Sequence, residues 1–466
     1  MAGERTTYSE ISPEFDPFHT YEAITEKSYI KAEHSGPLQG EVQVSGTKNM
    51  VSKVIAASLS ADEGTVRIRN IPFVGDLAIT LALCRRLGVN YQLDPSKKEL
   101  ELSVGDFTNP DVISDPYHGN RVAILFAGPV LAKLGRANIS KPEGCQIGER
   151  KIDYHLQGLK AFGVNITDKG NYYSLSLKKT TLEGTRYDLP FPSVGATENL
   201  LITASCAEGV SILNNCALEP EIIELVKILQ RSGVDIKTFP DRTLKIVGRK
   251  HGITPLIDVI PDRVEAASLA IAALASRGDV FIHGAQHEPL ISFLDVLQEM
   301  KAGFDIQDDG IRFYWREPLK AADITTEVYP GFPTDFQQPM AILMSQAEGR
   351  SSIHETIFEE RFRYLDELNK IATLPTSLNI STACPAGLPC RFKDANYKHT
   401  AYINGPIGFG AGEIEITDMR AGFAAINAAI ISSAEVTIRN LKGLYRGYEN
   451  PVGKLKSLGA KIELVI

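Results

Sequence analysis

The sequence predicts an α/β protein of two domains, built from six copies of a strand-helix-strand-helix unit of roughly 70 residues. Three observations favour this class. An apolar helix followed by a short β-branched strand recurs along the chain. A glycine follows the second helix of most copies. The 466 residues exceed what one hydrophobic core normally organises, so three units in each of two domains is the natural division.

The helix-then-strand pattern occurs six times. Each helical stretch is apolar and rich in small residues, and each strand carries the β-branched residues that are typical of strands. The pairs are residues 54–59 with 65–68, 123–128 with 137–139, 200–205 with 210–213, 269–274 with 279–282, 340–344 with 351–353, and 424–429 with 435–438.

Glycines mark where the second helix of each unit is expected to stop. Gly88, Gly163, Gly233 and Gly303 are 75, 70 and 70 residues apart, and Gly459 follows the last such helix. The glycine expected near residue 373 is missing. The wide gap before Gly459 therefore predicts an insertion at residues 374–398 of the fifth unit.

Composition narrows the classes of function. A net charge of −8 argues against a general nucleic-acid or membrane surface. The six cysteines lie far apart and form no Cys-x-x-Cys pair, which favours a reducing cytoplasm. Residues 1–28 are polar and acidic, lack the features of a secretory signal, and predict a loosely docked tail.

One loop combines a thiol with glycines and a cation. Gly144 and Gly148 flank Cys145, and Arg150 follows closely. Glycines let a loop fold tightly over a ligand, while a nearby cation and backbone N–H groups lower the pKa of a thiol. A cysteine is more often a small buried hydrophobic residue, so the loop alone leaves both interpretations open.

Eight motifs make the chain resemble the enolpyruvyltransferases, from about residue 30 to the end. They lie at residues 40–49, 144–150, 192–198, 219–222, 329–335, 355–362, 418–422 and 446–449. Within the family, the chain is most similar to the branch that acts on UDP-N-acetylglucosamine. The resemblance implies the enolpyruvyltransferase fold, a two-domain inside-out α/β barrel. We assign residues 29–48 with 262–466 to one domain and residues 49–261 to the other.

The resemblance implies that enolpyruvate passes from phosphoenolpyruvate to a hydroxyl group, with release of phosphate. Several fixed cations suit a substrate that carries a phosphate and a carboxylate. The residues that match the family's phosphoenolpyruvate site are Lys48, Asn49, Arg150, Arg361 and Arg420. An ordinary exposed salt bridge is the alternative for each cation.

The resemblance also implies roles in proton transfer. Cys145 matches the general acid, which can form a covalent adduct with phosphoenolpyruvate, and Asp335 matches the carboxylate that accepts the hydroxyl proton. Lys48 and Arg420 complete the implied catalytic set. A turn residue after Pro333 is the alternative interpretation of Asp335.

The acceptor site implied by the resemblance is larger. The turn at residues 192–195 can aim backbone N–H groups at a diphosphate. The implied acceptor contacts are Asn49, Arg121, Arg150, Lys151, Ile152, Asp153, Tyr154, Phe191, Ser193, Val194, Gly195, Asp335 and Ile357.

The chain departs from the family pattern mainly near the implied acceptor contacts, at residues 50–53, Leu125, Lys151 and Phe191. Three functions therefore stay open. The first is transfer to the 3-hydroxyl of UDP-N-acetylglucosamine, the first committed step of peptidoglycan synthesis. The second is transfer to another nucleotide, such as uridine monophosphate in nucleoside-antibiotic biosynthesis. The third is a non-catalytic role in regulation.

We expect two small-molecule substrates, phosphoenolpyruvate and a uridine nucleotide, and no cofactor, nucleic-acid partner or membrane partner. The resemblance makes Cys145 a target for fosfomycin. The sequence gives no oligomeric state. We also expect no metal, because Cys384 and Cys390 have no second ligand pair beside them and are interpreted as loop thiols.

Overall fold

The structure is a computed structural model that describes residues 18–113, 121–142, 152–248, 251–374, 377–385, 387, 390–392 and 395–466. Its described residues form two compact units. The first unit contains residues 46–260 with 18–19, and the second contains residues 20–45 and 261–466, apart from the gaps just given. Among the described residues the chain crosses between them at His19–Thr20, Ser45–Gly46 and Ile260–Pro261. For the last two crossings the sequence had suggested boundaries after residues 48 and 261.

Gly46 stands where the chain enters the first unit. A Cβ atom at this position would lie 1.8 Å from the carbonyl oxygen of Asn70 and 3.1 Å from Val259 Cγ1. No side chain fits against a backbone carbonyl at that distance. Close packing therefore requires glycine at position 46 of the motif at residues 40–49.

Six four-stranded sheets repeat one topology, three in each unit, within the described part of the chain. In the sheet β10-β11-β13-β12, β10 runs parallel to β11, and β13 lies antiparallel between β11 and β12. The other sheets follow the same order. Six repeats are thus confirmed, but each has the βαβαββ pattern, because two further antiparallel strands complete each sheet. These two strands follow the second helix as a hairpin in every repeat except the sixth, where β24 pairs with β1.

The first unit holds three repeats. The first comprises α2 (Lys48–Ser58), β3 (Gly64–Arg69), α3 (Gly75–Leu87), β4 (Asn90–Asp94), β5 (Glu99–Val104) and β14 (Leu256–Asp258). The second comprises β6 (Asp111–Val112), η4 (Val122–Phe126), α4 (Ala127–Leu134), β7 (Arg136–Ser140), α5 (Asp153–Ala161), β8 (Val164–Asp168) and β9 (Tyr172–Leu177). The third comprises β10 (Arg186–Asp188), α6 (Val194–Cys206), β11 (Gly209–Asn214), α7 (Pro220–Arg231), β12 (Asp235–Thr238) and β13 (Leu244–Gly248).

The second unit holds the other three, preceded by α1 (His19–Ala23). The fourth comprises β2 (Gln39–Gln43), α8 (Arg263–Ala275), β15 (Asp279–His283), α9 (His287–Glu299), β16 (Gly303–Gln307) and β17 (Gly310–Tyr314). The fifth comprises β18 (Asp323–Thr325), η5 (Thr334–Phe336), α10 (Gln337–Ser345), β19 (Gly349–His354), α11 (Arg363–Asn369), β20 (Leu378–Ser381) and β21 (Thr400–Gly405). The sixth comprises β22 (Gly412–Glu415), α12 (Met419–Ile430), β23 (Val436–Arg439), α13 (Lys442–Tyr445), α14 (Pro451–Ser457), β24 (Ile462–Val465) and β1 (Tyr29–Ala32).

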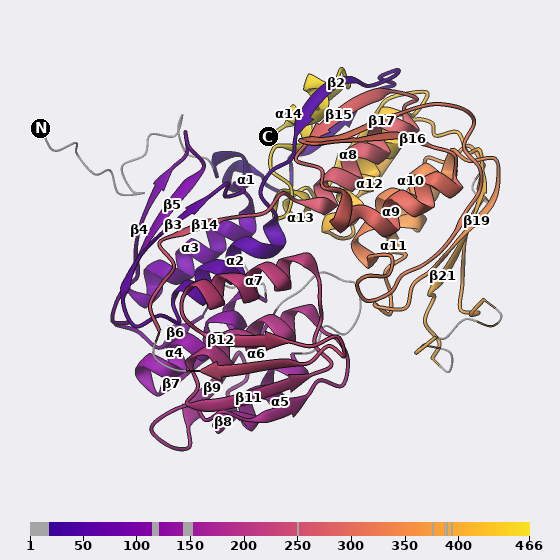
Figure 1. Ribbon diagram of the computed structural model, residues 1–466. Coiled ribbons are helices and arrows are strands. Elements are labelled where there is room, and N and C mark those ends of the chain that lie inside the picture. Colours follow the sequence, from indigo (N-terminus) through magenta and orange to yellow (C-terminus); the bar gives the residue numbers. More distant parts are fainter. Residues whose placement is uncertain are drawn as a thin grey trace, which may run out of the picture. The chain divides into compact units, whose positions relative to one another are not determined.

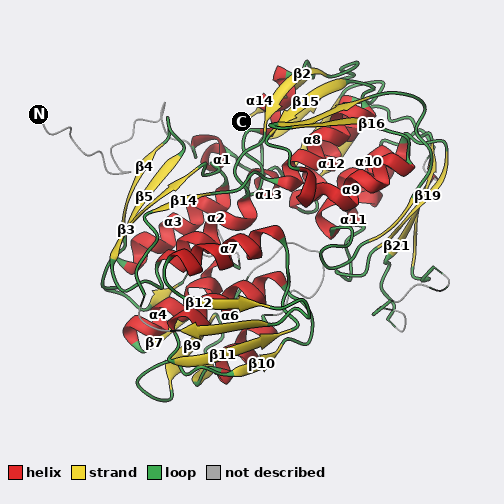
Figure 2. Cartoon of the chain, viewed as in Figure 1, coloured by secondary structure: helices red, strands yellow, loops and turns green. Residues whose placement is uncertain are grey.

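Each unit has its helices inside and its sheets outside (Figures 1 and 2). Every residue of α10 and α12 is buried, as is every residue of α8 except Arg263, and these three helices pack on one another. Strands such as β15 alternate between buried and partly exposed residues, because only one face of each sheet meets the helices. The predicted inside-out α/β fold is confirmed.

Three details of the prediction are wrong. Within the predicted tail 1–28, Phe18, Tyr21 and Ile24 are buried and α1 is formed, whereas residues 1–17 lie outside the described residues. Gly303 does not terminate a helix. Lys301 takes the left-handed conformation after α9, with φ 63°, and a Cβ at Gly303 would lie 2.6 Å from Tyr314.

The predicted insertion at residues 374–398 starts too early. Residues 378–381 form β20, the edge strand of the fifth sheet, and pair with β21. The extra length is the loop at residues 382–399 between these strands. In the stretches that the structure describes, no helix has the length and apolar character to cross a bilayer.

Candidate active site

A carboxylate lies between two buried arginines in the second unit. Asp335 Oδ1 accepts a hydrogen bond from Arg361 Nη2 at 2.8 Å, and Asp335 Oδ2 accepts one from Arg420 Nε at 3.1 Å. Arg420 Nη2 lies 3.0 Å from the same oxygen. Burial alone would raise the pKa of Asp335, but the two guanidinium groups outweigh it and hold that pKa far below its usual range. Asp335 is therefore ionised throughout the neutral range of pH.

Arg420 is fixed by the start of α12. The carboxylate of Asp418 caps this helix, accepting hydrogen bonds from the backbone N–H groups of Arg420 at 2.9 Å and Ala421 at 3.2 Å. The guanidinium carbon of Arg420 lies 5.2 Å from the ring centroid of Tyr448, at cation–π distance. Tyr448 is buried and its hydroxyl contacts Ser268 at 3.1 Å, so the ring has little freedom to move.

Arg361 lies just before α11 and is held from two sides. Its Nη1 donates to the hydroxyl of Thr334 at 2.7 Å, and its guanidinium carbon lies 5.1 Å from the ring centroid of Phe358. Thr334 and Asp335 both belong to η5, so this short helix presents a hydroxyl and a carboxylate to the same guanidinium. Only 4% of the Arg361 side chain is exposed, against 29% of the Asp335 side chain.

Two N–H groups of these arginines are buried and have no acceptor among the residues that the structure describes. They are Arg361 Nε and Arg420 Nη1. Buried donors are nearly always satisfied in folded proteins, so such groups call for an explanation. Fixed guanidinium donors beside a partly exposed carboxylate suit an anion with several oxygens, such as a phosphate or a carboxylate.

Glu355 holds the backbone around this cluster. Its buried carboxylate accepts hydrogen bonds from the hydroxyls of Thr326 at 2.9 Å and Thr334 at 2.7 Å. It also accepts from the backbone N–H groups of Ile357 at 2.8 Å and Phe358 at 3.1 Å. Glu355 therefore fixes both η5 and the segment that carries Ile357, one of the implied acceptor contacts.

Lys48 and Asn49 open α2 in the first unit. Thr47 caps the helix by accepting a hydrogen bond from the backbone N–H of Asn49 at 3.3 Å. Lys48 Nζ lies 2.8 Å from the carboxylate of Asp76, which is buried in the first turn of α3. An oriented ammonium group at a helix N-terminus is well suited to bind an anion.

One buried histidine of the first unit, His155, is influenced by the charge of Arg121 and lies against Gly195. Burial, with a smaller contribution from the charge of Arg121, lowers the pKa of His155 to about 3, so this imidazole is neutral. A Cβ on Gly195 would lie 3.4 Å from the ring of His155. Ser193 caps α6 by accepting from the backbone N–H of Ala196 at 3.4 Å. The predicted turn thus forms a helix N-terminus packed on His155.

A second acid in the first unit is buried near a cation. Glu198 lies within α6, and its carboxylate is 3.7 Å from Lys53 Nζ. Burial raises the pKa of Glu198 to about 7, with only partial compensation from Lys53. Glu198 therefore titrates in the neutral range.

The remaining implied contacts differ in exposure. Asp153 and Tyr154 open α5 and are partly exposed, as are Phe191 and Val194 before and at the start of α6. Ile152 is instead buried in the core of the first unit, so its side chain is not available to a ligand. Leu125, one of the departures from the family pattern, belongs to the same core. Cys145, Arg150 and Lys151 lie outside the described residues.

Residues 32–455 match the family described as EPSP synthase (3-phosphoshikimate 1-carboxyvinyltransferase). The chain belongs to this enolpyruvyltransferase family. The UDP-N-acetylglucosamine 1-carboxyvinyltransferase of Protochlamydia amoebophila is 39% identical over 436 residues, which cover 92% of each chain. Its counterpart in Chlamydia abortus is 40% identical over 431 residues, 92% of this chain and 96% of the relative.

Solved structures of other enolpyruvyltransferases share the fold. The enolpyruvyl transferase NikO from Streptomyces tendae has a TM-score of 0.81 and 22% identity, covering 95% of this chain and 99% of its own. EPSP synthase from Acinetobacter baumannii has a TM-score of 0.71 and 19% identity, covering 94% and 100%. At these identities the likeness establishes the architecture of this enolpyruvyltransferase.

Sequence reasoning missed part of the cluster. Thr334, Glu355 and Tyr448 were given no role, although each lies in one of the recognised motifs, at residues 329–335, 355–362 and 446–449. Their contribution was hidden because each acts by holding an arginine or the backbone. In this enolpyruvyltransferase, the motifs thus include supporting residues as well as those with an implied substrate contact.

Proposed function

We propose that the chain transfers the enolpyruvyl group of phosphoenolpyruvate to the 3-hydroxyl of UDP-N-acetylglucosamine, releasing phosphate. The observation that carries the proposal is the Asp335 carboxylate between two buried arginines that keep unsatisfied donors. The named activity of relatives at 36–40% identity over most of the chain supports the acceptor. The reaction would supply peptidoglycan synthesis and thereby cell-wall formation and cell shape.

The two charged groups of phosphoenolpyruvate fit the unsatisfied donors of Arg361 and Arg420. An arriving phosphate or carboxylate would compete with Asp335 for both guanidinium groups. Losing these partners would raise the pKa of Asp335 and make it a better proton acceptor. Substrate binding would therefore convert Asp335 from the anion of a salt bridge into a base.

The proton balance then needs one acid and one base. The acceptor hydroxyl attacks C2 of phosphoenolpyruvate and loses its proton to Asp335, while C3 gains a proton from Cys145. Phosphate then leaves C2 while one proton returns from C3 to the Cys145 thiolate, which restores the double bond and forms the enol ether. These steps use no cofactor beyond the two substrates.

The first unit would bind the nucleotide. The N-terminus of α6, capped by Ser193, and Arg121 beside His155 offer backbone N–H groups and a cation to a diphosphate. Lys48, at the start of α2, would contact phosphoenolpyruvate. None of the five described cysteines is in a disulfide, which supports a cytoplasmic location.

Phosphate release from phosphoenolpyruvate, with UDP-N-acetylglucosamine and uridine monophosphate compared as acceptors, tests the proposal. We expect release with the sugar nucleotide and a product that carries the enol ether at its 3-hydroxyl. Release with the monophosphate alone would favour the second candidate function. The departures from the family pattern at Phe191 and Lys151 support that alternative. Release with neither would overturn both, and a non-catalytic relative would remain.

Cys145→Ala tests the acid. Removing the thiol should lower turnover by about 10²–10⁴-fold, the usual contribution of a general acid. Fosfomycin should add covalently to the wild-type protein and not to the variant, as measured by intact mass. Normal turnover in Cys145→Ala would exclude the thiol as the proton donor.

A further inference from the structure

The loop at residues 382–399 brings together side chains that are distant in the sequence. It joins β20 to β21, whereas the matching strands β16 and β17 are joined by residues 308–309 alone. Long loops in compact domains usually carry a function or a structural support of their own. This loop contains two cysteines and ends at a histidine, His399.

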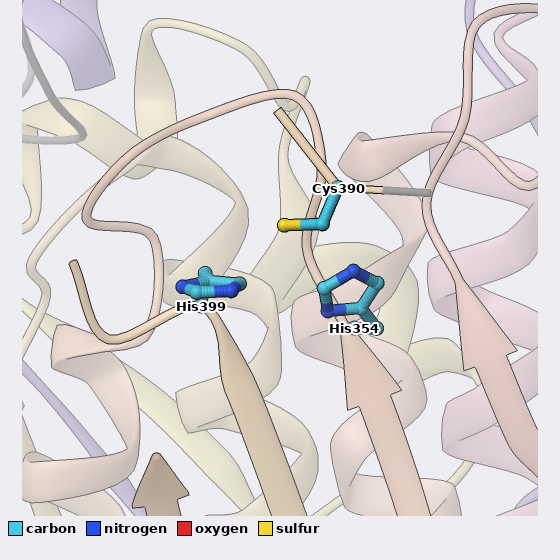
Figure 3. A group of neighbouring side chains, drawn as sticks. All are labelled: His354, Cys390 and His399. Atoms are coloured by element: carbon cyan, nitrogen blue, oxygen red, sulfur yellow. The ribbon is translucent and has the colours of Figure 1, made fainter. Parts of the chain in front are cut away.

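Three potential metal ligands converge beside this loop. One nitrogen each of His354 and His399 and the sulfur of Cys390 lie within 4.8 Å of one another. His354 is the last residue of β19, and His399 directly precedes β21. The three side chains face a common space (Figure 3). Ligand atoms around a tetrahedral zinc ion lie about 3.3–3.8 Å apart, so small side-chain adjustments suffice.

Hydrogen bonds fix the tautomer of both histidines. His399 Nδ1 lies 2.7 Å from the carbonyl oxygen of Tyr397, which can only accept, so Nδ1 carries the proton. Thr400 Oγ1 donates to the carbonyl of Ala383 at 2.8 Å and therefore accepts from His354 Nδ1 at 3.1 Å. Both imidazoles consequently hold a lone pair on Nε2, the arrangement found in metal-binding histidines.

The Nε2 atom of His354 has no hydrogen-bond partner among the described residues, and this side chain is fully buried. An acceptor nitrogen buried in this way is costly unless something binds it. Phe392 lies over the cluster, with its ring centroid 5.8 Å from that of His399. Both histidines are thus buried, and the free ring nitrogen of His354 points to a missing ligand.

The thiols supply the remaining ligands. The backbone N–H of Phe392 donates to Cys390 Sγ at 3.3 Å, which fixes the position of this sulfur. Cys384 Sγ lies 3.2 Å from His399 Nε2. Cys384 lies outside the group of three whose ligand atoms are within 4.8 Å of one another, so its side chain must move to complete the Cys₂His₂ set that is typical of structural zinc sites.

We propose that Cys384, Cys390, His354 and His399 bind one zinc ion that fastens the loop at residues 382–399 to strand β19. Binding displaces the two thiol protons to solvent and leaves both imidazoles neutral. With four protein ligands the site is closed, so its role is structural.

The metal would also support the segment beside the arginine cluster. Arg391, next to Cys390, donates to the backbone carbonyl of Ile357 and lies 3.7 Å from the carboxylate of Glu359. On the other side, His354 directly precedes Glu355. The zinc ion would therefore anchor both the loop and the strand end from which the Ile357 segment departs.

The metal content of the purified full-length protein tests the proposal. We expect about one zinc per chain by elemental mass spectrometry, and loss of that zinc in Cys390→Ser and in His399→Gln. His283→Gln is the matched control, because this histidine lies on β15 of the same unit and pairs with Glu41 and Asp309 instead. The control should keep its zinc.

Cobalt substitution keeps the test valid if a variant fails to fold. Wild-type protein stripped of metal and given Co²⁺ should show the visible bands of a tetrahedral ion and a thiolate charge-transfer band, both weaker in Cys384→Ser. Absence of zinc together with absence of these bands would overturn the proposal. So would equal zinc in wild type and Cys390→Ser, or an intact mass showing a Cys384–Cys390 disulfide in freshly purified protein.

Discussion

Asp335 and Glu198 are both acids that lie beside cations, yet their pKa values are shifted in opposite directions. Asp335 contacts two guanidinium groups at 2.8–3.1 Å, and its pKa lies far below the usual range. Glu198 has one ammonium group at 3.7 Å, and burial raises its pKa to about 7. Burial penalises both charges, so the outcome depends on the neighbouring charges: two close guanidinium groups for Asp335, and for Glu198 one ammonium group opposed by the carboxylates of Glu221 and Glu219.

The comparison shows how each unit sets the ionisation state of a buried carboxyl group. The second unit keeps a carboxylate ionised by placing it between two arginines. The first unit keeps a carboxyl group close to half protonation at neutral pH.

Arg420→Met should have the largest effect, because it leaves Asp335 with a single cation. Breaking a buried ion pair costs about 3–5 kcal/mol, and we expect a loss of this order together with loss of enolpyruvyl transfer. Urea unfolding and phosphate release measure the two effects. Arg439→Met, which removes an exposed pair with Glu413, is the control and should cost about 1 kcal/mol or less. Equal losses in both variants would contradict the special status of Arg420.

Asp335→Asn should separate the two functions of the cluster. Turnover should fall by about 10²–10⁴-fold because the base is lost. Inorganic phosphate should nevertheless stabilise the variant more than the wild type, since the arginines no longer have a competing carboxylate. Thermal unfolding with and without phosphate checks this. An equal or smaller phosphate effect in the variant would show that Asp335 does not compete with anions.

Glu198→Gln should change how stability depends on pH. The raised pKa of Glu198 means that its stabilising contribution is complete below its unfolded value of 4.5 and is lost as pH rises through about 7. The shift corresponds to about 3 kcal/mol, which the wild type should lose between pH 4.5 and about pH 7 and the variant should keep. Unfolding free energies across this range provide the measurement. Parallel profiles would rule out titration of Glu198.

Lys53→Met should have the smallest effect. The ammonium group at 3.7 Å partly offsets the burial of Glu198, so its removal should raise the pKa of Glu198 further. The steep part of the pH profile should move to higher pH, with a change of about 1 kcal/mol or less near pH 6. A profile that moves to lower pH would contradict this assignment of cause.

The fold was largely predictable because each repeat is marked by local sequence patterns, an apolar helix followed by a β-branched strand and a glycine after the second helix. Gly88, Gly163, Gly233 and Gly459 all take positive φ after a helix, as expected. The closing hairpins were missed because two short strands such as β12 and β13 carry only weak alternation. Gly303 misled because a glycine that avoids Tyr314 looks the same in sequence as one that ends a helix.

Residues of the candidate site were predicted only where they belong to a family motif. Asp335, Arg361 and Arg420 were found by resemblance, and the structure brings them together. The proposed zinc ligands were not recognised as a set, and Cys384 and Cys390 were interpreted as loop thiols. His354 and His399 lie 36 and 9 residues from Cys390 and meet only through the pairing of β19 with β21. Pairing between distant strands is the information that a local reading of sequence lacks.

The strands β1 and β2 have a consequence for synthesis on the ribosome. They complete sheets of the second unit, and β1 pairs with β24, which begins about 430 residues after β1 ends. At about 5–20 residues per second, β1 emerges roughly 20–90 s before that partner exists. The first unit, encoded in between, can close during this interval. Nascent chains therefore carry early strands with open edges, which makes the second unit the half that depends more on chaperones.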